Sequence, residues 1–244
     1  MRLRGESMAV TDEAVSRIRE LIISGVLQPG DRLPQESVLA EQLGISRNST
    51  REALRVLEQM RVLTVRHGSG TYVTSLEPSK LLEGISFAVE MMRDHTLREV
   101  LEVRQLLEPA ATRLAVQRMT PAKLSAIREA YELYGAQTTI EDLVHRDFVF
   151  HSAIISAADN ETLFSILDGL SSKTVRLRIW GGIVSENAVH LTIDHHHQIL
   201  KAIEAGDAHL AEAAALVHVN NARSWLDAYL DAHPVVGAQS SPAD

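Results

Sequence analysis

Apolar residues recur every three or four positions along almost the whole chain, and this helical spacing gives way to β-prone sequence in one place. There, two short runs within residues 62–73 flank the Gly-rich turn Arg66-His67-Gly68-Ser69-Gly70, a pattern typical of a β-hairpin. The sequence therefore predicts a mainly α protein whose strand content is small and confined to its front part.

Three helices are expected before the hairpin. The first ends at Gly25, the second begins just after Pro34 and is stopped by Gly44, and Ser46 is a good N-cap for the third. The positions expected to be buried on these helices are Ala14, Ile18, Leu21, Ile22, Val38, Leu39, Leu43, Thr50, Ala53, Leu54 and Leu57. Helix, helix, Gly-containing turn, helix and hairpin is the order of a winged helix-turn-helix, with the hairpin as the wing.

The outer face of the third helix carries side chains suited to DNA. The residues left on that face are Arg47, Asn48, Arg51 and Arg55. Arginine and asparagine near a helix N-terminus can form paired hydrogen bonds with the edges of guanine and adenine in the major groove. Ser49 and the helix N-terminus can bind phosphate. In the wing, Gly68 next to His67 would let the backbone approach a phosphate or the minor groove closely. The alternative is that these arginines are ordinary solvent-exposed residues of a helix surface and do not contact DNA.

Charge and histidine are distributed unevenly along the chain. The net charge of the chain is −8. Residues 1–76 hold ten arginines, no lysine and nine acidic residues, which gives them a net charge of +1 and leaves −9 for residues 77–244. Of 11 histidines, only His67 precedes residue 90. Such different halves indicate two domains. The expected organisation is a winged helix-turn-helix over residues 9–75, a linker over 76–80, an all-α antiparallel helical bundle over 81–233 and a disordered tail over 234–244.

Several classes of protein are excluded by composition. The chain has no cysteine, which rules out disulfides, thiolate metal sites and cysteine nucleophiles and fits a cytoplasmic setting. It has no run of 18 apolar residues and no apolar segment behind Arg2 and Arg4, so we expect neither a transmembrane helix nor a secretory signal.

Four helices are expected in the rear half. The first is closed by Thr120-Pro121, the second opens with a capping box at Thr138-Thr139, the third runs over about 185–205, and the last runs from Asp207 to about Ala232. The apolar stripe of the first is Leu97, Val100, Val103, Leu107, Ala110 and Leu114. That of the second is Ile140, Leu143, Val144, Phe150, Ile154 and Ile155.

Polar side chains are expected to point into this bundle from three helices. Asp147 and His151 share a face at i, i+4, while His196 and His218 lie on the apolar stripes of the last two helices. Burying such polar groups without a partner would cost free energy. One metal ion that all four side chains coordinate would remove this cost. A nitrogen and oxygen ligand set suits zinc first, with nickel, manganese or iron as alternatives. The competing interpretations are core histidines hydrogen-bonded to carboxylates, or a buried Asp147–His151 ion pair.

The other rear histidines are expected at the surface or behind the ligands. The five assigned in this way are His145, His190, His195, His197 and His209. Because His195, His196 and His197 are consecutive, a register ambiguity remains, and the stripe argument favours His196.

The front half is similar to a known family. The sequence GVLQPGDRLPQESVLAEQLGISRNSTREALRVLEQMRVLTVRHGSGTYV resembles the winged helix of the GntR family of bacterial transcription regulators. The resemblance implies DNA contacts from the recognition helix and the wing. The implied residues are Arg47, Asn48, Ser49, Arg51, His67 and Gly68. Family members often have an arginine shortly after the Leu-Pro pair, where this chain has Ser37, so one contact there is missing or weaker.

The rear half resembles the FCD ligand-binding domain of the FadR-like branch of that family. The segments that carry the resemblance are EVRQLLEPAATRLA within 99–115, DFVFHSAI at 147–154 and HHHQILKAIEAGD at 195–207, followed by His218. It implies that Asp147, His151, His196 and His218 are metal ligands. It also implies that Arg104, which faces the bundle interior, helps to hold a carboxylate effector; the alternative is a simple Arg104–Glu108 helix pair.

These observations favour a homodimeric regulator that binds an inverted-repeat operator in double-stranded DNA and responds to a small organic acid. The resemblance implies a repressor that the effector releases. A metal-dependent enzyme and a metal-free dimerisation module are the rival hypotheses. No general base beyond the ligands is evident, which argues against the enzyme.

Overall fold

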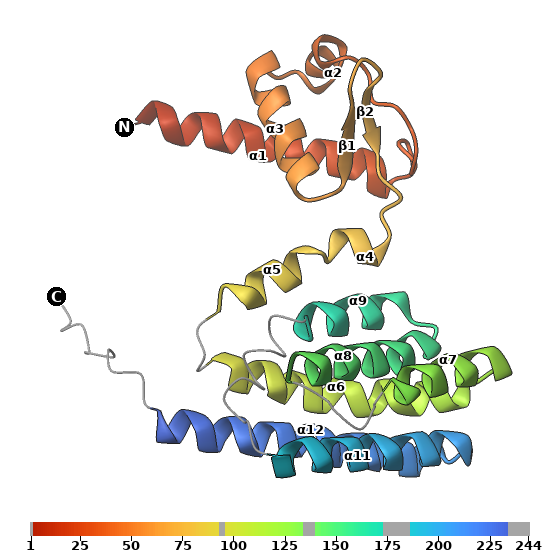
Figure 1. Ribbon diagram of the computed structural model, residues 1–244. Helices are drawn as coiled ribbons and strands as arrows, with labels where there is room; N and C mark the ends of the chain where they lie inside the picture. Colours follow the sequence, from red (N-terminus) through yellow and green to blue (C-terminus); the bar gives the residue numbers. More distant parts are fainter. Residues whose placement is uncertain (1, 93–95, 134–139, 173–185, 234–244) are drawn as a thin grey trace. The chain divides into compact units, whose positions relative to one another are not determined.

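The computed structural model describes residues 2–92, 96–133, 140–172 and 186–233 (Figure 1). The chain divides into two compact units, Met1–Leu81 and Leu82–Asp244. The predicted capping box at Thr138-Thr139 and the predicted tail over 234–244 lie outside the described residues.

The first unit contains three helices followed by a hairpin, as the sequence predicts. They are α1 (Arg2–Ile23), α2 (Glu36–Leu43), α3 (Arg47–Gln59), β1 (Leu63–Arg66) and β2 (Gly70–Val73). The strands are antiparallel and pair Leu63 with Val73 and Arg66 with Gly70. A winged helix-turn-helix is therefore present.

Local signals set the geometry between α2 and α3. Gly44 ends α2 in the left-handed conformation at φ 65°, which glycine adopts without a Cβ penalty. Ser46 caps α3 by accepting a hydrogen bond from the Ser49 backbone N–H at 3.1 Å. Both residues have the predicted role. Together they fix the turn that presents the N-terminus of α3.

The core of the first unit follows the predicted pattern with one exception. Its buried apolar members are Ala14, Ile18, Leu33, Leu39, Leu43, Ala53, Leu54, Leu57, Leu63 and Val73. Thr50 is also buried, while Leu21 and Ile22 are half-buried. Val38, predicted to be buried, is 44% exposed. Ala40 takes the inward position instead, because it shares the face of α2 that Leu39 and Leu43 turn towards the core.

All the regular elements that the structure describes in the second unit are helices. The short α4 (Pro78–Leu81) lies at the boundary, inside and just beyond the predicted linker. The helices that follow are α5 (Gly84–Glu90), α6 (Leu97–Gln117), α7 (Pro121–Glu132), α8 (Ile140–Ala157), α9 (Glu161–Leu170), α11 (Glu186–Glu204) and α12 (Ala208–Ala232). In Figure 1 α6, α11 and α12 run side by side, and α6 packs extensively on α12.

Side-chain caps begin several of these helices. Thr120 caps α7, Asn160 caps α9, and Asp207 caps α12 by accepting from the backbone N–H groups of His209 and Leu210. No helix in the described part of the chain is long and apolar enough to cross a membrane.

The inward face of α6 differs from the predicted stripe. Val103 is 40% exposed, whereas Leu101 is fully buried. The buried face also contains three polar residues: Arg104, which was expected to face the interior, and Glu108 and Thr112, which a count of apolar residues does not reveal. The predicted apolar stripe of this helix therefore overlaps the observed buried face only in part.

Candidate metal centre and DNA-binding surface

Three helices of the second unit bring four polar side chains together in its interior. α8 supplies Asp147 and His151, one turn apart, α11 supplies His196 and α12 supplies His218. All four are buried, with exposed fractions of 0 to 5%. The four residues that the sequence singles out as metal ligands thus lie at one point, and the favoured member of the histidine run, His196, is the one that faces it.

The convergence is tight. The Nε2 atoms of His151 and His196 are 3.2 Å apart, those of His151 and His218 are 3.1 Å apart, and those of His196 and His218 are 3.4 Å apart. Oδ1 of Asp147 is 3.6 Å, 3.3 Å and 3.8 Å from the Nε2 atoms of His151, His196 and His218 respectively. Three imidazole nitrogens and one carboxylate oxygen therefore enclose a common centre.

These separations match the spacing of donors around one small cation. Ligand atoms about 2.0–2.2 Å from zinc stand about 3.3–3.6 Å apart at the corners of a tetrahedron. In an octahedral shell with ligands at about 2.1 Å, adjacent donors would stand about 3.0 Å apart. The observed separations of 3.1–3.8 Å centre on the tetrahedral spacing and lie above the spacing of adjacent octahedral donors. Hydrogen bonding alone gives no reason for three Nε2 atoms to converge, since each pair of nitrogens can share only one proton.

The surroundings favour neutral imidazoles. Burial lowers the pKa of His151 to about 4, with the Glu108 carboxylate opposing this effect and the Arg104 guanidinium adding to it. Burial, and then the neighbouring His196 and His151, hold the pKa of His218 well below its usual range. A neutral imidazole keeps a lone pair on one ring nitrogen, which is the form that binds a metal.

Arg104 and Glu108 lie next to this group on α6 and form a buried ion pair. Arg104 donates from Nε to Oε1 of Glu108 at 2.5 Å. Glu108 also faces His151, with 3.7 Å between Oε2 and Nδ1, and accepts a hydrogen bond from Ser171 Oγ at 3.3 Å. The helix pair considered as the alternative for Arg104 is thus present. Sequence reasoning did not select Glu108 as a site residue, although its i, i+4 spacing from Arg104 was a usable signal.

The five other histidines assigned from the sequence divide between the two expected places. His145, His190, His197 and His209 are exposed. His195 is buried, and Asn221 Nδ2 approaches its Nε2 at 3.2 Å. Packing of α11 on α12 covers both His195 and His196.

The front unit exposes the predicted residues of the recognition helix. Arg47, Asn48 and Arg51 are exposed and Ser49 is half-exposed at the start of α3, while Ser37 is half-buried in the first turn of α2. A polar hollow of about 470 Å³ lies there. Its lining residues are Thr11, Ser46, Asn48, Ser49, Arg51, Glu52 and Arg55.

Two of these arginines have acidic partners within the unit. Arg51 donates to Glu36 at 3.1 Å and Arg55 to Glu52 at 2.9 Å. Each pair is about half exposed, and exposed ion pairs contribute only about 0–1 kcal/mol. The guanidinium groups can therefore exchange these partners for phosphate or a base edge at little cost.

The wing places His67 and Gly68 at its exposed tip. Gly68 has φ 71°, a left-handed conformation that favours glycine. Behind the tip, the Arg66 guanidinium lies 4.4 Å from the centre of the Tyr72 ring, and Tyr72 Oη lies 2.6 Å from Ser69 Oγ. These contacts hold the two strands of the wing together.

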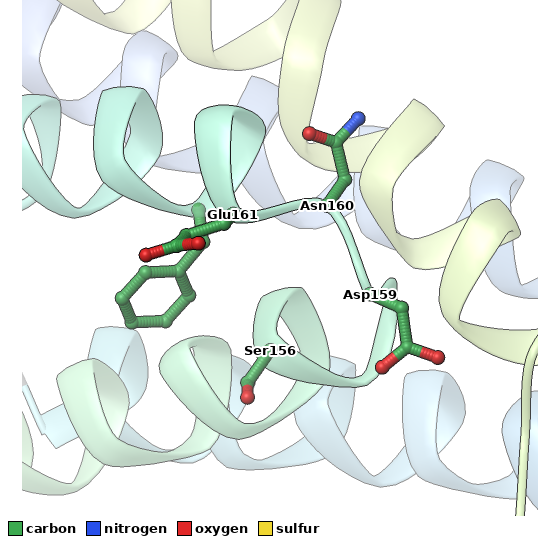
Figure 2. A pocket seen from close by; sticks show the side chains of 5 residues that line it. Ser156, Asp159, Asn160 and Glu161 are labelled. Atoms are coloured by element: carbon green, nitrogen blue, oxygen red, sulfur yellow. The ribbon is translucent and has the colours of Figure 1, made fainter. Parts of the chain in front are cut away.

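The turn between α8 and α9 lines a further hollow, of about 290 Å³ (Figure 2). Two of its polar side chains already have structural partners. Asn160 accepts from the Leu163 backbone N–H at 3.0 Å, and the Asp159 carboxylate pairs with Lys123. The hollow is a helix junction and adds nothing to the metal centre.

Comparison with protein families assigns both units. Residues 10–73 match the family described as bacterial regulatory proteins, gntR family, and residues 99–221 match the FCD domain. The second match covers half of the chain and includes all four residues of the buried Asp–His group.

Individual relatives agree. The chain is 33% identical over 217 residues to the HTH-type transcriptional regulator LutR of Bacillus subtilis, covering 86% of this chain and 98% of that one. It is 30% identical to the galactonate operon transcriptional repressor of Escherichia coli, covering 86% and 93%. Among solved structures, Streptococcus agalactiae GntR superposes with a TM-score of 0.61 at 28% identity, covering 88% and 99%. These relatives are regulators of transcription, not enzymes. The chain belongs to the GntR family of bacterial transcription regulators and carries an FCD domain behind its winged helix-turn-helix.

Proposed function

We propose that this DNA-binding regulator is a homodimeric repressor, released from an inverted-repeat operator when a small carboxylate binds near a metal ion in its FCD domain. The observation that carries the proposal is the buried convergence of Asp147, His151, His196 and His218, joined in one chain to a winged helix-turn-helix. The galactonate operon relative is itself named a repressor, which supports the direction of control.

The proposed operator contacts come from α3, the wing and α2. Arg47, Asn48 and Arg51 would enter the major groove, and Ser49 would bind phosphate at the helix N-terminus. His67 and Gly68 would contact the backbone or the minor groove, with Ser37 giving at most one weak contact. Because the front unit carries little net charge, two copies and a local basic patch must supply the phosphate neutralisation.

The proposed effector site is built from the metal centre and Arg104. Zinc is the first candidate for the four nitrogen and oxygen donors, with nickel, manganese or iron as alternatives. When bound, the metal would act as a Lewis acid that accepts a carboxylate oxygen of the effector. The guanidinium of Arg104 would hold a second anionic or hydroxyl group of the same molecule through its terminal nitrogens, since Nε is already used by Glu108.

The exposed face shared by α6 and α12 supports a homodimer. Large apolar side chains lie open there, with Leu106 72% exposed and Val103 and Leu216 each 40% exposed. The polar pair Gln105–Asn220, at 2.6 Å, joins the same two helices. Apolar surface surrounded by polar groups is typical of a protein interface, and a second copy of this chain is the partner that an inverted repeat requires.

The DNA arm of the proposal is tested by selecting operator fragments with the purified protein and measuring fluorescence anisotropy. Arg47→Ala and Arg51→Ala should each weaken specific binding by about 5-fold or more, as expected for loss of about 1–3 kcal/mol per base contact. Arg19→Ala, an exposed arginine of α1, is the matched control and should change little. Unchanged binding by both α3 variants would refute the recognition-helix assignment.

The proposed response to an effector is tested on the same protein–operator complex. A panel of small mono- and dicarboxylic acids is added to the zinc-loaded protein on its operator, and one class should release the DNA. Release should be lost in Asp147→Asn. A metal-free dimerisation module would instead bind DNA with equal affinity whether or not chelator and carboxylates are present.

A further inference from the structure

Glu108 touches both parts of the proposed effector site at once. It is 2% exposed and comes from α6, whereas the four grouped donors come from α8, α11 and α12. Its Oε1 receives the Arg104 Nε hydrogen bond at 2.5 Å, and its Oε2 lies 3.7 Å from Nδ1 of His151. The two oxygens of one carboxylate thus face two different partners.

The side of His151 that Glu108 faces is the side away from the other donors. Nε2 of His151 points to the centre, 3.2 Å from Nε2 of His196 and 3.1 Å from Nε2 of His218. If Nε2 gives its lone pair to a metal, the neutral ring must carry its proton on Nδ1. A carboxylate beside Nδ1 then fixes the tautomer and orientation of the ring and raises the basicity of the ligand nitrogen.

We propose that Glu108 is a positioning residue of the metal centre, which holds His151 in its ligand tautomer through Oε2 while it holds Arg104 in place through Oε1. This inference rests on the proposed metal-binding function. It makes Glu108 the physical link between the ion and the arginine that would meet the effector. A contraction of about 0.5–0.8 Å would close the Oε2–Nδ1 separation to hydrogen-bond length.

The rival account is that Glu108 serves only to neutralise Arg104. Removing Glu108 alone cannot separate the two accounts, because it would leave a buried arginine unpaired and could unfold the protein. Removing both members of the pair avoids that difficulty, because exchanging a buried ion pair for apolar residues of similar size is often neutral or stabilising.

The test therefore compares the wild type with variants that lack both members of the pair. Zn²⁺ affinity is measured by competition with a chromophoric chelator for the wild type, Arg104→Met, Arg104→Met/Glu108→Met and Arg104→Met/Glu108→Gln. If Glu108 positions His151, the double Met variant should bind Zn²⁺ about 10- to 100-fold more weakly than the wild type, because removal of the Arg104 positive charge alone would not weaken the binding of a cation. The Gln variant should recover part of the loss, and the Co²⁺ absorption spectrum should change with it. Glu99→Gln, on the exposed side of α6, is the control and should leave affinity unchanged.

A second measurement needs no variant at this pair. In the wild-type Zn²⁺-loaded protein, ¹⁵N NMR of the histidine rings should show His151 protonated on Nδ1, with that proton protected from exchange. A change of less than twofold in the double Met comparison, or an unprotected Nδ1–H in the wild type, would overturn the inference. If the wild type and Arg104→Met bind no Zn²⁺ at all, the proposed metal function fails instead.

Discussion

Asp147 is the one carboxylate among four converging donors, so its charge has the largest single effect on a cation at the centre. Its Oδ1 lies within 3.8 Å of three Nε2 atoms. With three neutral imidazoles around it, the carboxylate supplies the negative charge that distinguishes a divalent ion from a neutral occupant such as water.

Asp147→Asn should therefore weaken Zn²⁺ binding strongly while preserving side-chain shape. For the wild type at a free Zn²⁺ concentration 100 times Kd, binding should stabilise the FCD unit by about 2.7 kcal/mol. Differential scanning calorimetry with and without Zn²⁺ should show this upward shift in the wild type and in Asp194→Asn, an exposed aspartate of α11. It should be small or absent in Asp147→Asn; an equal shift in all three proteins would contradict the role of Asp147.

Sequence reasoning located this group better than it located its surroundings. The four donors could be predicted because each lies on the apolar stripe of its own helix, where a polar residue is conspicuous. The i, i+4 spacing puts Glu108 on the same face of α6 as Arg104, but it does not show that Glu108 lies beside His151. For His195 the sequence left open whether it lies at the surface or behind the ligands. Both answers depend on which helices pack against α6 and α11, and this tertiary information is not contained in the spacing along one helix.

At the scale of elements, α5 and α9 pack through a glycine. A Cβ added to Gly169 would lie 2.9 Å from Cγ2 and 3.0 Å from Cβ of Ile85, and 3.3 Å from the backbone N of Ser86. The close approach of these two helices therefore depends on the missing side chain.

Gly169→Ala should accordingly destabilise the second unit by about 1–3 kcal/mol, the usual cost of overpacking. Gly84→Ala is the matched control, since Gly84 is also helical, has no positive φ and has nothing within 4 Å of the added Cβ. That variant should be neutral or slightly stabilising. Urea unfolding of both variants checks the difference, and equal stabilities would show that α5 and α9 do not pack as closely as described.

The ends of helices could be predicted where a residue next to the helix in sequence caps it. Gly44, Ser46 and Asp207 end or begin helices where the sequence places them. The errors concern which side chains face the core, not which helices exist. Val38 and Val103 were expected to face inward because they are apolar, yet the buried faces of α2 and α6 use Ala40 and Leu101 instead.

At the scale of the whole molecule, the proposal requires two copies of the chain. Leu106→Glu places a charge in the middle of the exposed apolar face of α6 and should weaken self-association by at least 10-fold, because a charge buried at an interface without a partner is costly. Analytical ultracentrifugation over a range of concentrations measures the change. Leu133→Glu, at the end of α7 and 47% exposed, is the control.

Operator binding should fall together with dimerisation in Leu106→Glu, since one winged helix alone reads only a half-site. If Leu106→Glu stays dimeric and Leu133→Glu becomes monomeric, the interface lies elsewhere on the FCD unit.

The central claim is that a regulator with this fold carries a resident metal ion among Asp147, His151, His196 and His218. Elemental analysis of the purified, extensively dialysed protein tests it most directly. The account predicts about one divalent metal ion per wild-type chain and close to none in Asp147→Asn/His218→Ala, with both proteins folded by circular dichroism. A metal-free wild type that also takes up no added Zn²⁺, or equal metal content in both proteins, would contradict it.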